Sequence, residues 1–556
     1  MSKAIWPTSI WLACTAALSL TAASALAMPP ARHAELKIDP DRLNAYVREL
    51  SDDRYEGRAP STAGETLAIA WIAAQFKSLG LEPAGPNGSW FQDVPLMKFI
   101  RKGPAASRFH VGGADWVPAP GDDILVNSIR PIAHAQIVGA PMVFVGYGVK
   151  APERGWDDFK GVDLRGKIVV VLVNDPDFEA PEGHPTHDRF DGQAMTYYGR
   201  WTYKFEEAAR QGAAGVLIVH ETPGAGYGWA TLQNSDNTPK LDIVRENPAE
   251  HSAPVQGWIQ RPVAEELFRR AGLDFAALKE AAKRAEFRPV VIPGATFSTG
   301  FDVDVQRVMS HNVVAKITGR RHPTETVLFS GHWDHLGRAK PDASGDDIYN
   351  GAIDNATGVA AVLELARLFA EGPKPDRTVM FASWTAEEAG LLGAEYYAAH
   401  PLRPLETTVG NLNFDAMLPG PVDPNIVIIG FGKSNMQDWL QRVAAAHGRT
   451  LIPDPAPQAG AFYRSDHFPL ARRGVPVLFP SAGFTGASEA SKAYVKDHYH
   501  QPADEWDPAW RFDGAAADLQ LAYQVGMQLA DSRDWPGWNA GSEFAAERAK
   551  SARMRR

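Results

Sequence analysis

The sequence predicts an α/β fold in which helices cover both faces of a mixed, mostly parallel sheet. Short apolar, β-prone runs such as 326–330 and 378–384 alternate with longer runs whose apolar residues recur at helical spacing, such as 358–369. Alternating strands and helices of this size are typical of a parallel sheet with helices packed on it. A β-rich stretch between about residues 133 and 293 interrupts the pattern, and we expect it to be an inserted domain.

Taken in chain order, the elements begin with two helices, at 42–50 and 64–79, and Gly80 ends the second. The β-rich stretch contains three runs punctuated by glycine, at 143–148, 166–172 and 212–219. The sheet resumes near residue 301, with strands expected at 312–317, 326–330, 378–384, 411–414, 425–429 and 475–479. Further helices are expected at 358–369, 389–399, 437–447 and 514–529. The stretch 481–499 has no periodicity, and we expect it to be a functional loop.

Length and composition limit the class of protein. A chain of 556 residues exceeds what one hydrophobic core usually organises, so at least two domains are expected. Its content of 45% apolar and 22% charged residues is typical of a globular protein. The net charge of −10 and the lack of a basic patch argue against nucleic-acid binding. Only the end of the chain, 548–556, is locally basic, and we expect a solvated, disordered tail there.

The first 27 residues are typical of a secretory signal peptide. Lys3 is followed by an apolar core from Ile10 to Leu20 and by the small-x-small cleavage site Ala25-Leu26-Ala27. The apolar core is short and contains Ser and Thr, so we expect no membrane span. A lipoprotein is the alternative, but the residues before Cys14 form a poor lipobox. Since Cys14 is the only cysteine, the mature chain would have none, and we expect an exported protein of the bacterial periplasm or medium, without disulfides.

Acidic and imidazole side chains occur close to the ends of the predicted strands. His332 and Asp334 follow one strand, Glu387 and Glu388 follow the next, and Asp354 precedes a helix. The carboxyl edge of an open α/β sheet is where ligands bind. Imidazole and carboxylate together suit a divalent metal, zinc above all. Because there are more carboxylates than one ion needs, a pair of ions sharing a carboxylate is expected.

The order of these motifs resembles the M28 family of zinc peptidases, which contains bacterial secreted aminopeptidases and glutamate carboxypeptidase. The motifs are HxD at 332–334, GAxDNATG at 351–358, AEEAGLLG at 386–393, NFDAM at 413–417 and YHQPAD at 499–504. The resemblance implies a zinc exopeptidase fold. The phrases EGR at 56–58 and GLEP at 80–83 are also similar to the opening of M28 enzymes, and the β-rich insert resembles a protease-associated (PA) domain.

The resulting division of the chain has five parts. They are a signal peptide at 1–27, an N-terminal part of the catalytic domain at 28–132, a PA-like insert at 133–293, the M28 catalytic domain at 294–535 and a basic tail at 536–556.

The resemblance implies a ligand set for two zinc ions per chain. His332 and Asp415 would bind one ion, Glu388 and His500 the other, and Asp354 would bridge the two. We prefer His500 to His498, which shares a face with it on extended chain, because the sequence QPAD follows His500 as a related motif follows the family ligand.

The resemblance also implies three catalytic roles. Glu387 would be the general base toward the metal-bound water, Asp334 would orient His332, and Tyr463 would donate a hydrogen bond to the oxyanion. The family pattern has no ligand at His335, and we expect it to be a loop histidine. With His500 as the ligand, we expect His467 to support the site or to belong to the core.

Ordinary structural roles compete with each of these assignments. Asp354 would serve equally as a helix cap, and Glu387-Glu388 as the solvated start of a helix. Five motifs in the family's order favour the metal site over these readings.

The loop at 175–200 leaves two interpretations open. It contains His184, His187, Asp188 and Asp191, which would suit a metal cluster. Exposed loops are often polar, however, and we favour the interpretation that these side chains are simply solvated. With its aromatic residues Tyr197 and Tyr198, and with Trp201 just after it, we expect the loop to overhang the active site and restrict substrate entry.

The expected function is a secreted, monomeric, two-zinc exopeptidase acting on peptides, and most specifically an aminopeptidase. A glutamate-carboxypeptidase-like enzyme is the first alternative, since Arg464, Arg472 and Arg473 would cradle a substrate carboxylate. A glutaminyl cyclase would use one zinc ion. A non-catalytic peptide-binding protein would not need the complete ligand set.

Overall fold

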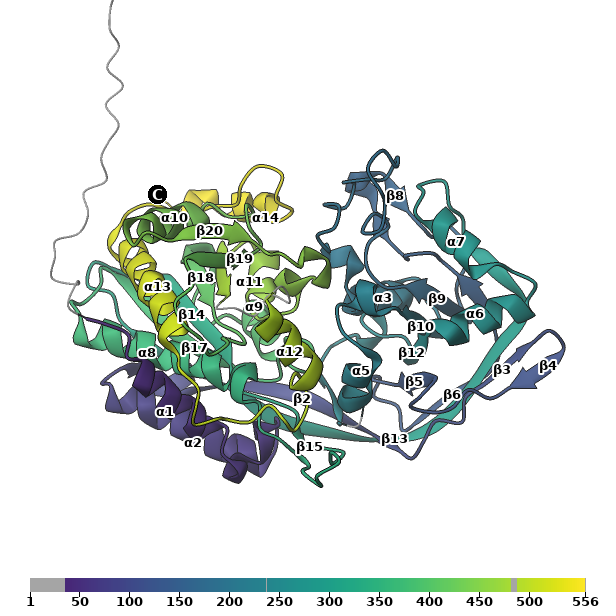
Figure 1. Cartoon of the computed structure of the whole chain (residues 1–556), viewed down its shortest axis with the longest axis horizontal. Coiled ribbons are helices and arrows are strands. Elements are labelled where there is room, and N and C mark those ends of the chain that lie inside the picture. Colours follow the sequence, from purple (N-terminus) through teal and green to yellow (C-terminus); the bar gives the residue numbers. More distant parts are fainter. Residues whose placement is uncertain (1–35, 237, 482–487, 556) are drawn as a thin grey trace, which may run out of the picture. The chain divides into compact units, whose positions relative to one another are not determined.

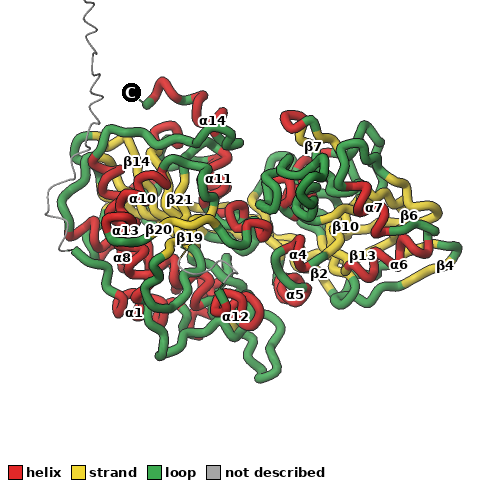
Figure 2. Tube along the Cα trace, turned by 45° about the horizontal axis from the view of Figure 1, so that its top comes forward, coloured by secondary structure: helices red, strands yellow, loops and turns green. Residues whose placement is uncertain are grey.

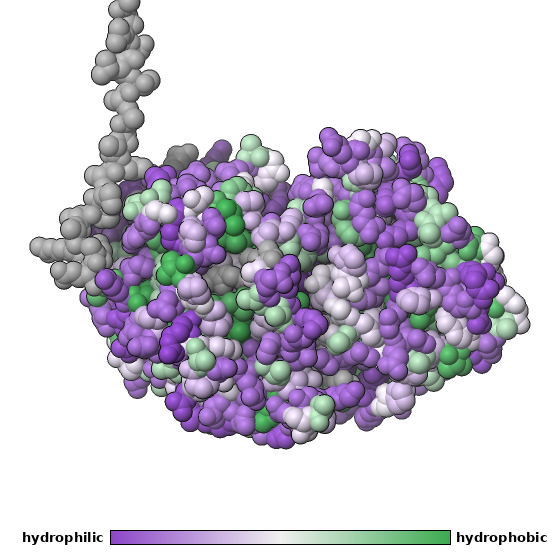
Figure 3. Space-filling view, viewed as in Figure 1, coloured by the Kyte–Doolittle hydropathy of each residue, from purple (hydrophilic) through white to green (hydrophobic). Residues whose placement is uncertain are grey.

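The computed structural model describes residues 36–236, 238–481 and 488–555. The expected signal peptide at 1–27 lies outside these residues and stays a prediction. None of the helices in the described part of the chain combines the length and apolarity that a membrane span requires. On the face drawn in Figure 3, hydrophilic residues predominate and apolar residues are scattered among them.

The part of the sheet formed by residues 290–481 is mixed and mostly parallel, which confirms the predicted fold class. Three neighbouring strands run parallel, in the order β17, β14, β18, and β21 continues the sheet in the same direction. The edges are mixed, because β13 is antiparallel to β17 and β19 is antiparallel to β21 but parallel to β20. The bounds are β13 (Val290–Ile317), β14 (His322–His332), β17 (Arg377–Trp384), β18 (Thr408–Asn413), β19 (Asn425–Ile429), β20 (Thr450–Pro453) and β21 (Val477–Ser481).

Alternate side chains of the strands pack into two hydrophobic cores, one on each face of the sheet. Val327 and Phe329 of β14 belong to the larger core, whereas Leu328 between them belongs to the other. The larger core is covered by α1 (Pro40–Leu50), α2 (Ala63–Ser78), α8 (Thr357–Glu371), α10 (Met436–Ala446) and α13 (Asp513–Asp531) (Figure 1). The smaller core is covered by α9 (Leu392–Ala399) and α11 (His467–Arg472). This alternation follows from the two-residue period of a strand.

The inserted segment is an α/β layer and not only β-rich. Its strands β6, β9, β10 and β12 are parallel in that order, and β5 is antiparallel to β12. Helices follow β9, β10 and β12 in the chain and lie around the strands of this segment (Figure 2). The bounds are β5 (Ile124–Asn127), β6 (His134–Phe144), β9 (Ile168–Leu172), α3 (Trp201–Arg210), β10 (Gly215–His220), α5 (Trp229–Asp236), β12 (Val255–Gln260), α6 (Arg261–Arg270) and α7 (Phe275–Ala282).

One long strand, β13, joins the strands of the insert to those of residues 290–481 in a single sheet. Its first half pairs with β6, its last five residues pair with β17, and between them it pairs with β2 (Phe91–Lys102). The insert is therefore joined to the rest of the sheet through the backbone pairing of β13, which has irregularities between Val291 and Thr296 and between Phe297 and Thr299.

Two stretches differ from the sequence-based expectations. A helix, α12 (Glu489–Asp497), lies inside the stretch expected to be a loop, with the Ser488 hydroxyl accepting the Ser491 N–H at its start. Only Ser491 and Tyr494 of this helix are buried, so it lacks a repeated apolar face that the sequence could reveal. The basic tail is also ordered in part, because α14 (Ala545–Lys550) forms and Arg548 is buried.

Candidate metal centre

Parallel strands bring the predicted acidic and imidazole residues to one edge of the sheet. His332 is the last residue of β14, Glu387 and Glu388 follow β17, and Asp415 follows β18. Since these three strands are neighbours and parallel, their carboxyl ends lie side by side. Asp354 reaches the same edge from η7 (Ala352–Ala356), a π-helical turn before α8.

The first group of potential ligands consists of His332, Asp354 and Asp415. Nε2 of His332 lies 3.3 Å from Oδ1 of Asp354 and 3.3 Å from Oδ1 of Asp415. The three residues offer ligand atoms close enough together to hold one metal ion. The Ser465 hydroxyl donates to the other oxygen of Asp415 at 2.6 Å, which orients that carboxylate.

The second group shares Asp354 with the first. Nε2 of His500 lies 3.3 Å from Oδ2 of Asp354 and 2.9 Å from Oε2 of Glu388. Asp354 therefore presents one oxygen to each group, the arrangement of a bridging carboxylate. By contrast, the ring of His498 is exposed and pairs with the Ala503 carbonyl at 2.7 Å.

His335 is not the simple loop histidine that the sequence suggested. It is 1% exposed, and its Nδ1 lies 2.6 Å from Oε1 of Glu388. With Asp354 and Glu388 it forms a second set of residues able to hold a metal ion. Glu388 thus lies between two imidazoles, with one oxygen toward His335 and the other toward His500.

The residues present fit two zinc ions. Among the described residues, the ring nitrogens of His335 and His500 and Oε1 of Glu388 are buried and have no partner of good hydrogen-bond geometry. Nδ1 of His335 nevertheless lies 2.6 Å from Oε1 of Glu388, and Nε2 of His500 lies 2.9 Å from Oε2 of Glu388. Buried polar atoms normally form hydrogen bonds, so converging atoms that do not are suited to coordinating a cation. Nitrogen and carboxylate oxygen are the ligand atoms that zinc prefers.

Asp334 forms hydrogen bonds both to the His332 ring and to the turn that carries Glu387 and Glu388. Its backbone carbonyl accepts from Nδ1 of His332 at 3.1 Å, which fixes the ring so that Nε2 faces the carboxylates. Its carboxylate lies 3.7 Å from the same nitrogen and accepts the backbone N–H groups of Glu387 at 3.0 Å and of Glu388 at 3.4 Å. The expected contact to His332 is therefore made by the carbonyl, while the side chain fixes the turn that carries the two glutamates.

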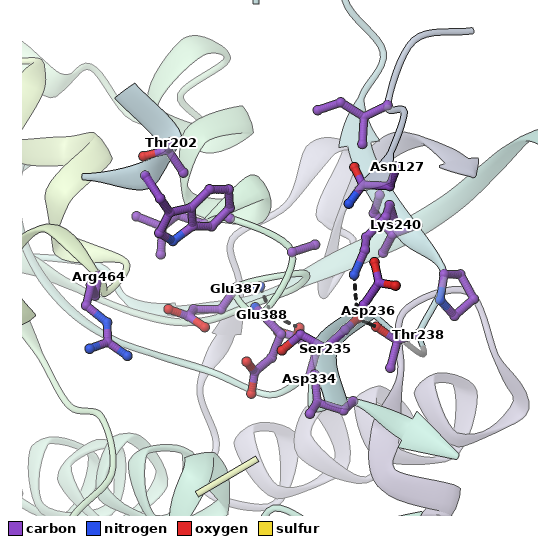
Figure 4. Close-up of a pocket in the computed structure, with 18 of the residues that line it drawn as sticks. Asn127, Thr202, Ser235, Asp236, Thr238, Lys240, Asp334, Glu387, Glu388 and Arg464 are labelled. Carbon is purple, nitrogen blue, oxygen red and sulfur yellow. Dashed lines mark hydrogen bonds between the residues drawn. The ribbon is translucent and has the colours of Figure 1, made fainter. Parts of the chain in front are cut away.

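Glu387 faces the cavity beside the first group. Its Oε2 lies 3.9 Å from Nε2 of His332, and Figure 4 shows its side chain, with that of Glu388, among the residues lining the pocket. Burial raises the pKa of Glu387 well above its usual value; the charge of His332 opposes this, and the charges of Asp415 and Glu388 add to it. A carboxyl group with a raised pKa is suited to taking up and releasing a proton.

Tyr463 is directed to the C-terminal segment. Its hydroxyl donates to Oε1 of Glu543 at 2.5 Å and accepts from Nζ of Lys433 at 3.3 Å. A different tyrosine adjoins the ligands: the Tyr499 ring stacks on His500 at 3.9 Å between centroids, and its hydroxyl accepts from Arg464 at 3.1 Å. The oxyanion role expected for Tyr463 stays a prediction.

A cavity of about 620 Å³ adjoins the potential ligands, and it is lined both by residues from the turn at 387–391 and by residues of the insert. Tyr197, Arg200 and Trp201 contribute from the end of the loop that was expected to overhang the site. Tyr198 instead donates its hydroxyl to Glu153 at 2.7 Å. Within the described residues, His184, His187, Asp188 and Asp191 of this loop are not among the groups of side chains that could hold a metal ion.

His467 belongs to the core. It is fully buried, and its ring packs against Phe462 and Phe479 with centroid distances of 4.7 and 5.0 Å. Burial lowers its pKa to about 3, so the ring is neutral.

Comparison with known proteins agrees with this geometry. The sequence model of peptidase family M28 matches residues 312–524 of this chain. Aminopeptidase NAALADL1 of Rattus norvegicus is 32% identical over 89% of this chain and 71% of its own length. Probable glutamate carboxypeptidase AMP1 of Arabidopsis thaliana is 24% identical over 68% of this chain, and this chain spans about half of that relative (51%). Among solved structures, an aminopeptidase from Aneurinibacillus sp. strain AM-1 has a similar fold, with a TM-score of 0.53 and 19% identity over 89% of this chain and 95% of the other.

Proposed function

This chain belongs to peptidase family M28, and from that membership we propose that it is an exported, monomeric two-zinc exopeptidase that releases N-terminal residues from peptides. The proposal depends mainly on the position of the Asp354 carboxylate. One of its oxygens faces the group of His332 and Asp415, and the other faces the group of Glu388 and His500. A glutaminyl cyclase, with one zinc ion, would not need a carboxylate shared in this way.

The five ligands would hold two zinc ions, His332 and Asp415 one, Glu388 and His500 the other, with Asp354 between them. Zinc bound there would polarise the scissile carbonyl and make the attacking water more acidic. Asp334 would keep His332 and the glutamate turn in place for this task through its carbonyl and its carboxylate.

Glu387 would carry the proton. Its carboxylate would accept a proton from the attacking water and then donate it to the amine that leaves when the peptide bond breaks. The raised pKa of the buried carboxyl group supports this double role, because a strongly acidic group would not return the proton.

A second candidate function is a carboxypeptidase acting on acidic C-termini, and two arginines favour it. Arg200 is 7% exposed, lines the cavity with Glu387, and among the described residues its Nε has no hydrogen-bond partner. Burial and the charge of Arg464 lower the pKa of Arg200 to about 10. A buried guanidinium group, that of Arg200, and a half-buried one, that of Arg464, both line the cavity and are suited to binding a carboxylate of the substrate.

The two functions are separated by blocking one end of the same peptide. The zinc-loaded protein is incubated with a short peptide, its N-acetylated form and its C-terminal amide, and the products are identified by mass spectrometry. An aminopeptidase cleaves the free peptide and the amide from the N-terminal end and leaves the acetylated form intact. A carboxypeptidase cleaves the acetylated form and spares the amide. If protein with two bound zinc ions cleaves none of a panel of such peptides, the exopeptidase proposal is wrong.

A further inference from the structure

Arg58 joins two loops of the metal centre although it lies far from both in the sequence. Its guanidinium group donates from Nε to the Trp333 carbonyl at 2.9 Å and from Nη2 to the Gly351 carbonyl at 2.9 Å. Nη1 donates to the carbonyls of Leu50 at 2.7 Å and Asn350 at 2.5 Å. The side chain is 1% exposed, and these four carbonyls accept four of the five N–H groups of its guanidinium group.

Two of these carbonyls belong to residues next to the potential metal ligands. Trp333 lies between His332 and Asp334, and Gly351 directly precedes the η7 turn that carries Asp354. The 3.3 Å separation of His332 and Asp354 therefore depends on two backbone segments that one guanidinium group holds together. A planar group with several fixed donors suits this task, and a lysine ammonium would not reproduce it.

The turn that carries Arg58 has an unusual backbone conformation. Residues Glu56, Gly57 and Arg58 all have positive φ, at 47°, 68° and 50°. A Cβ on Gly57 would approach the carbonyl oxygens of Gly337 and Tyr349 to 2.6 Å, so only glycine fits there. The Arg58 carbonyl in turn accepts the His335 N–H at 3.4 Å. Non-glycine residues with positive φ are uncommon and persist where the surroundings hold them.

The charge of Arg58 also matches its surroundings. Burial lowers its pKa to about 10, and the carboxylates of Asp504, Asp334, Asp354 and Glu388 oppose that effect. The guanidinium group therefore stays charged at neutral pH and offsets part of the negative charge that gathers at this edge.

We propose that Arg58 is a positioning residue of the metal centre, which sets the distance between the His332 segment and the Asp354 turn through backbone carbonyls. The proposal rests on the two-metal site of the proposed function. It assigns a role to the EGR phrase near the start of the chain.

The test compares Arg58→Lys with Arg377→Lys as a matched control. Arg377 is also fully buried, and its Nη1 donates to the carbonyls of Leu529 at 2.7 Å and Asp534 at 3.0 Å, but it lies at the start of β17, the opposite end from the ligands. Zinc dissociation constants are measured by competition with a chromogenic chelator, together with the unfolding midpoint and the split of activity into kcat and KM. We expect R58K to weaken zinc binding by about 10-fold to 100-fold and to lower kcat more than it changes KM. R377K should lower the unfolding midpoint and leave zinc binding within about twofold of the parent.

The proposal is overturned if R58K binds zinc as tightly as the parent, or if R377K loses zinc affinity to the same extent. If R58K does not fold, Arg58→Gln is measured in the same way. Unfolding of both variants would assign Arg58 to the fold instead and would also overturn the proposal. A parent protein that binds two zinc ions without peptidase activity would contradict the proposed function but leave this test intact, because zinc affinity is its readout.

Discussion

At the scale of single residues, two adjacent glutamates have different surroundings. Glu388 lies between His335 and His500, within 2.9 Å of both imidazoles, whereas Glu387 faces His332 at 3.9 Å and the cavity. The Asp334 carboxylate accepts both of their backbone N–H groups, so one side chain fixes the turn that separates them. The contacts therefore support a ligand role for Glu388 and a proton-transfer role for Glu387.

The substitution Glu387→Gln tests this division of roles. Glutamine keeps the shape of the side chain but cannot accept the proton, so kcat should fall by at least ~100-fold. Zinc content, measured by mass spectrometry of the metals, should stay at the parent's value because Glu387 is not among the proposed ligands. Glu395→Gln is the control, since Glu395 lines the same cavity and lies at the limit of ion pairing with Arg472, 4.0 Å away. Near-parental turnover in E387Q would refute the proposed mechanism.

At the scale of elements, the η7 turn is held in place from several sides. The Asp504 carboxylate, from the late YHQPAD motif, accepts the backbone N–H groups of Ile353 and Asp354 at 3.0 Å each. Gly351, at φ 59°, leads into the turn, and a Cβ there would approach the Asp354 carbonyl oxygen to 2.3 Å and Cγ of His335 to 2.5 Å. The shape of this turn thus depends on a glycine and on a carboxylate about 150 residues later in the chain.

Gly351→Ala should therefore displace Asp354 or His335 and impair zinc binding. Gly345→Ala is the control, because Gly345 also has positive φ, at 95°, but a Cβ there would meet no atom within 4 Å. We expect the control to lose only the roughly 1–2 kcal/mol that a left-handed alanine costs. G351A should be destabilised by more than this and should bind zinc more weakly, as measured by denaturant unfolding and metal titration. Equal behaviour of the two variants would show that the contacts of Gly351 do not shape the site.

At the scale of the whole described chain, the insert contributes to the site. The side chain of Asn234 in α5 donates to the His500 carbonyl at 3.1 Å, and the Asn174 side chain donates to the Gln458 carbonyl at 3.0 Å. Together with the cavity residues from the loop end, these contacts support the expectation that the insert restricts access to the metal centre. Its identity as a PA domain and the boundaries of the domains stay predictions.

Much of the fold and the ligand-bearing loops could be predicted from the sequence, because both depend on local patterns. Apolar runs define the strands, and in a parallel sheet the residues after neighbouring strands must meet at one edge. Arg58 and Arg200 were not recognised as site residues, because their contacts are made only when segments distant in the sequence fold together. His335 was missed for a related reason: its burial against Glu388 depends on how two loops pack, which spacing does not encode. The helix α12 was missed because only Ser491 and Tyr494 of its residues are buried, which leaves no repeated apolar face in the sequence.

The central claim is that His332, Asp354, Asp415, Glu388 and His500 bind two zinc ions. Anomalous diffraction from crystals of the zinc-loaded protein, recorded at the zinc absorption edge, tests it directly. Two peaks should appear about 3.5–4 Å apart, one beside His332 and Asp415 and the other beside Glu388 and His500, with Asp354 between them. A single peak, or peaks away from these five side chains, would contradict it.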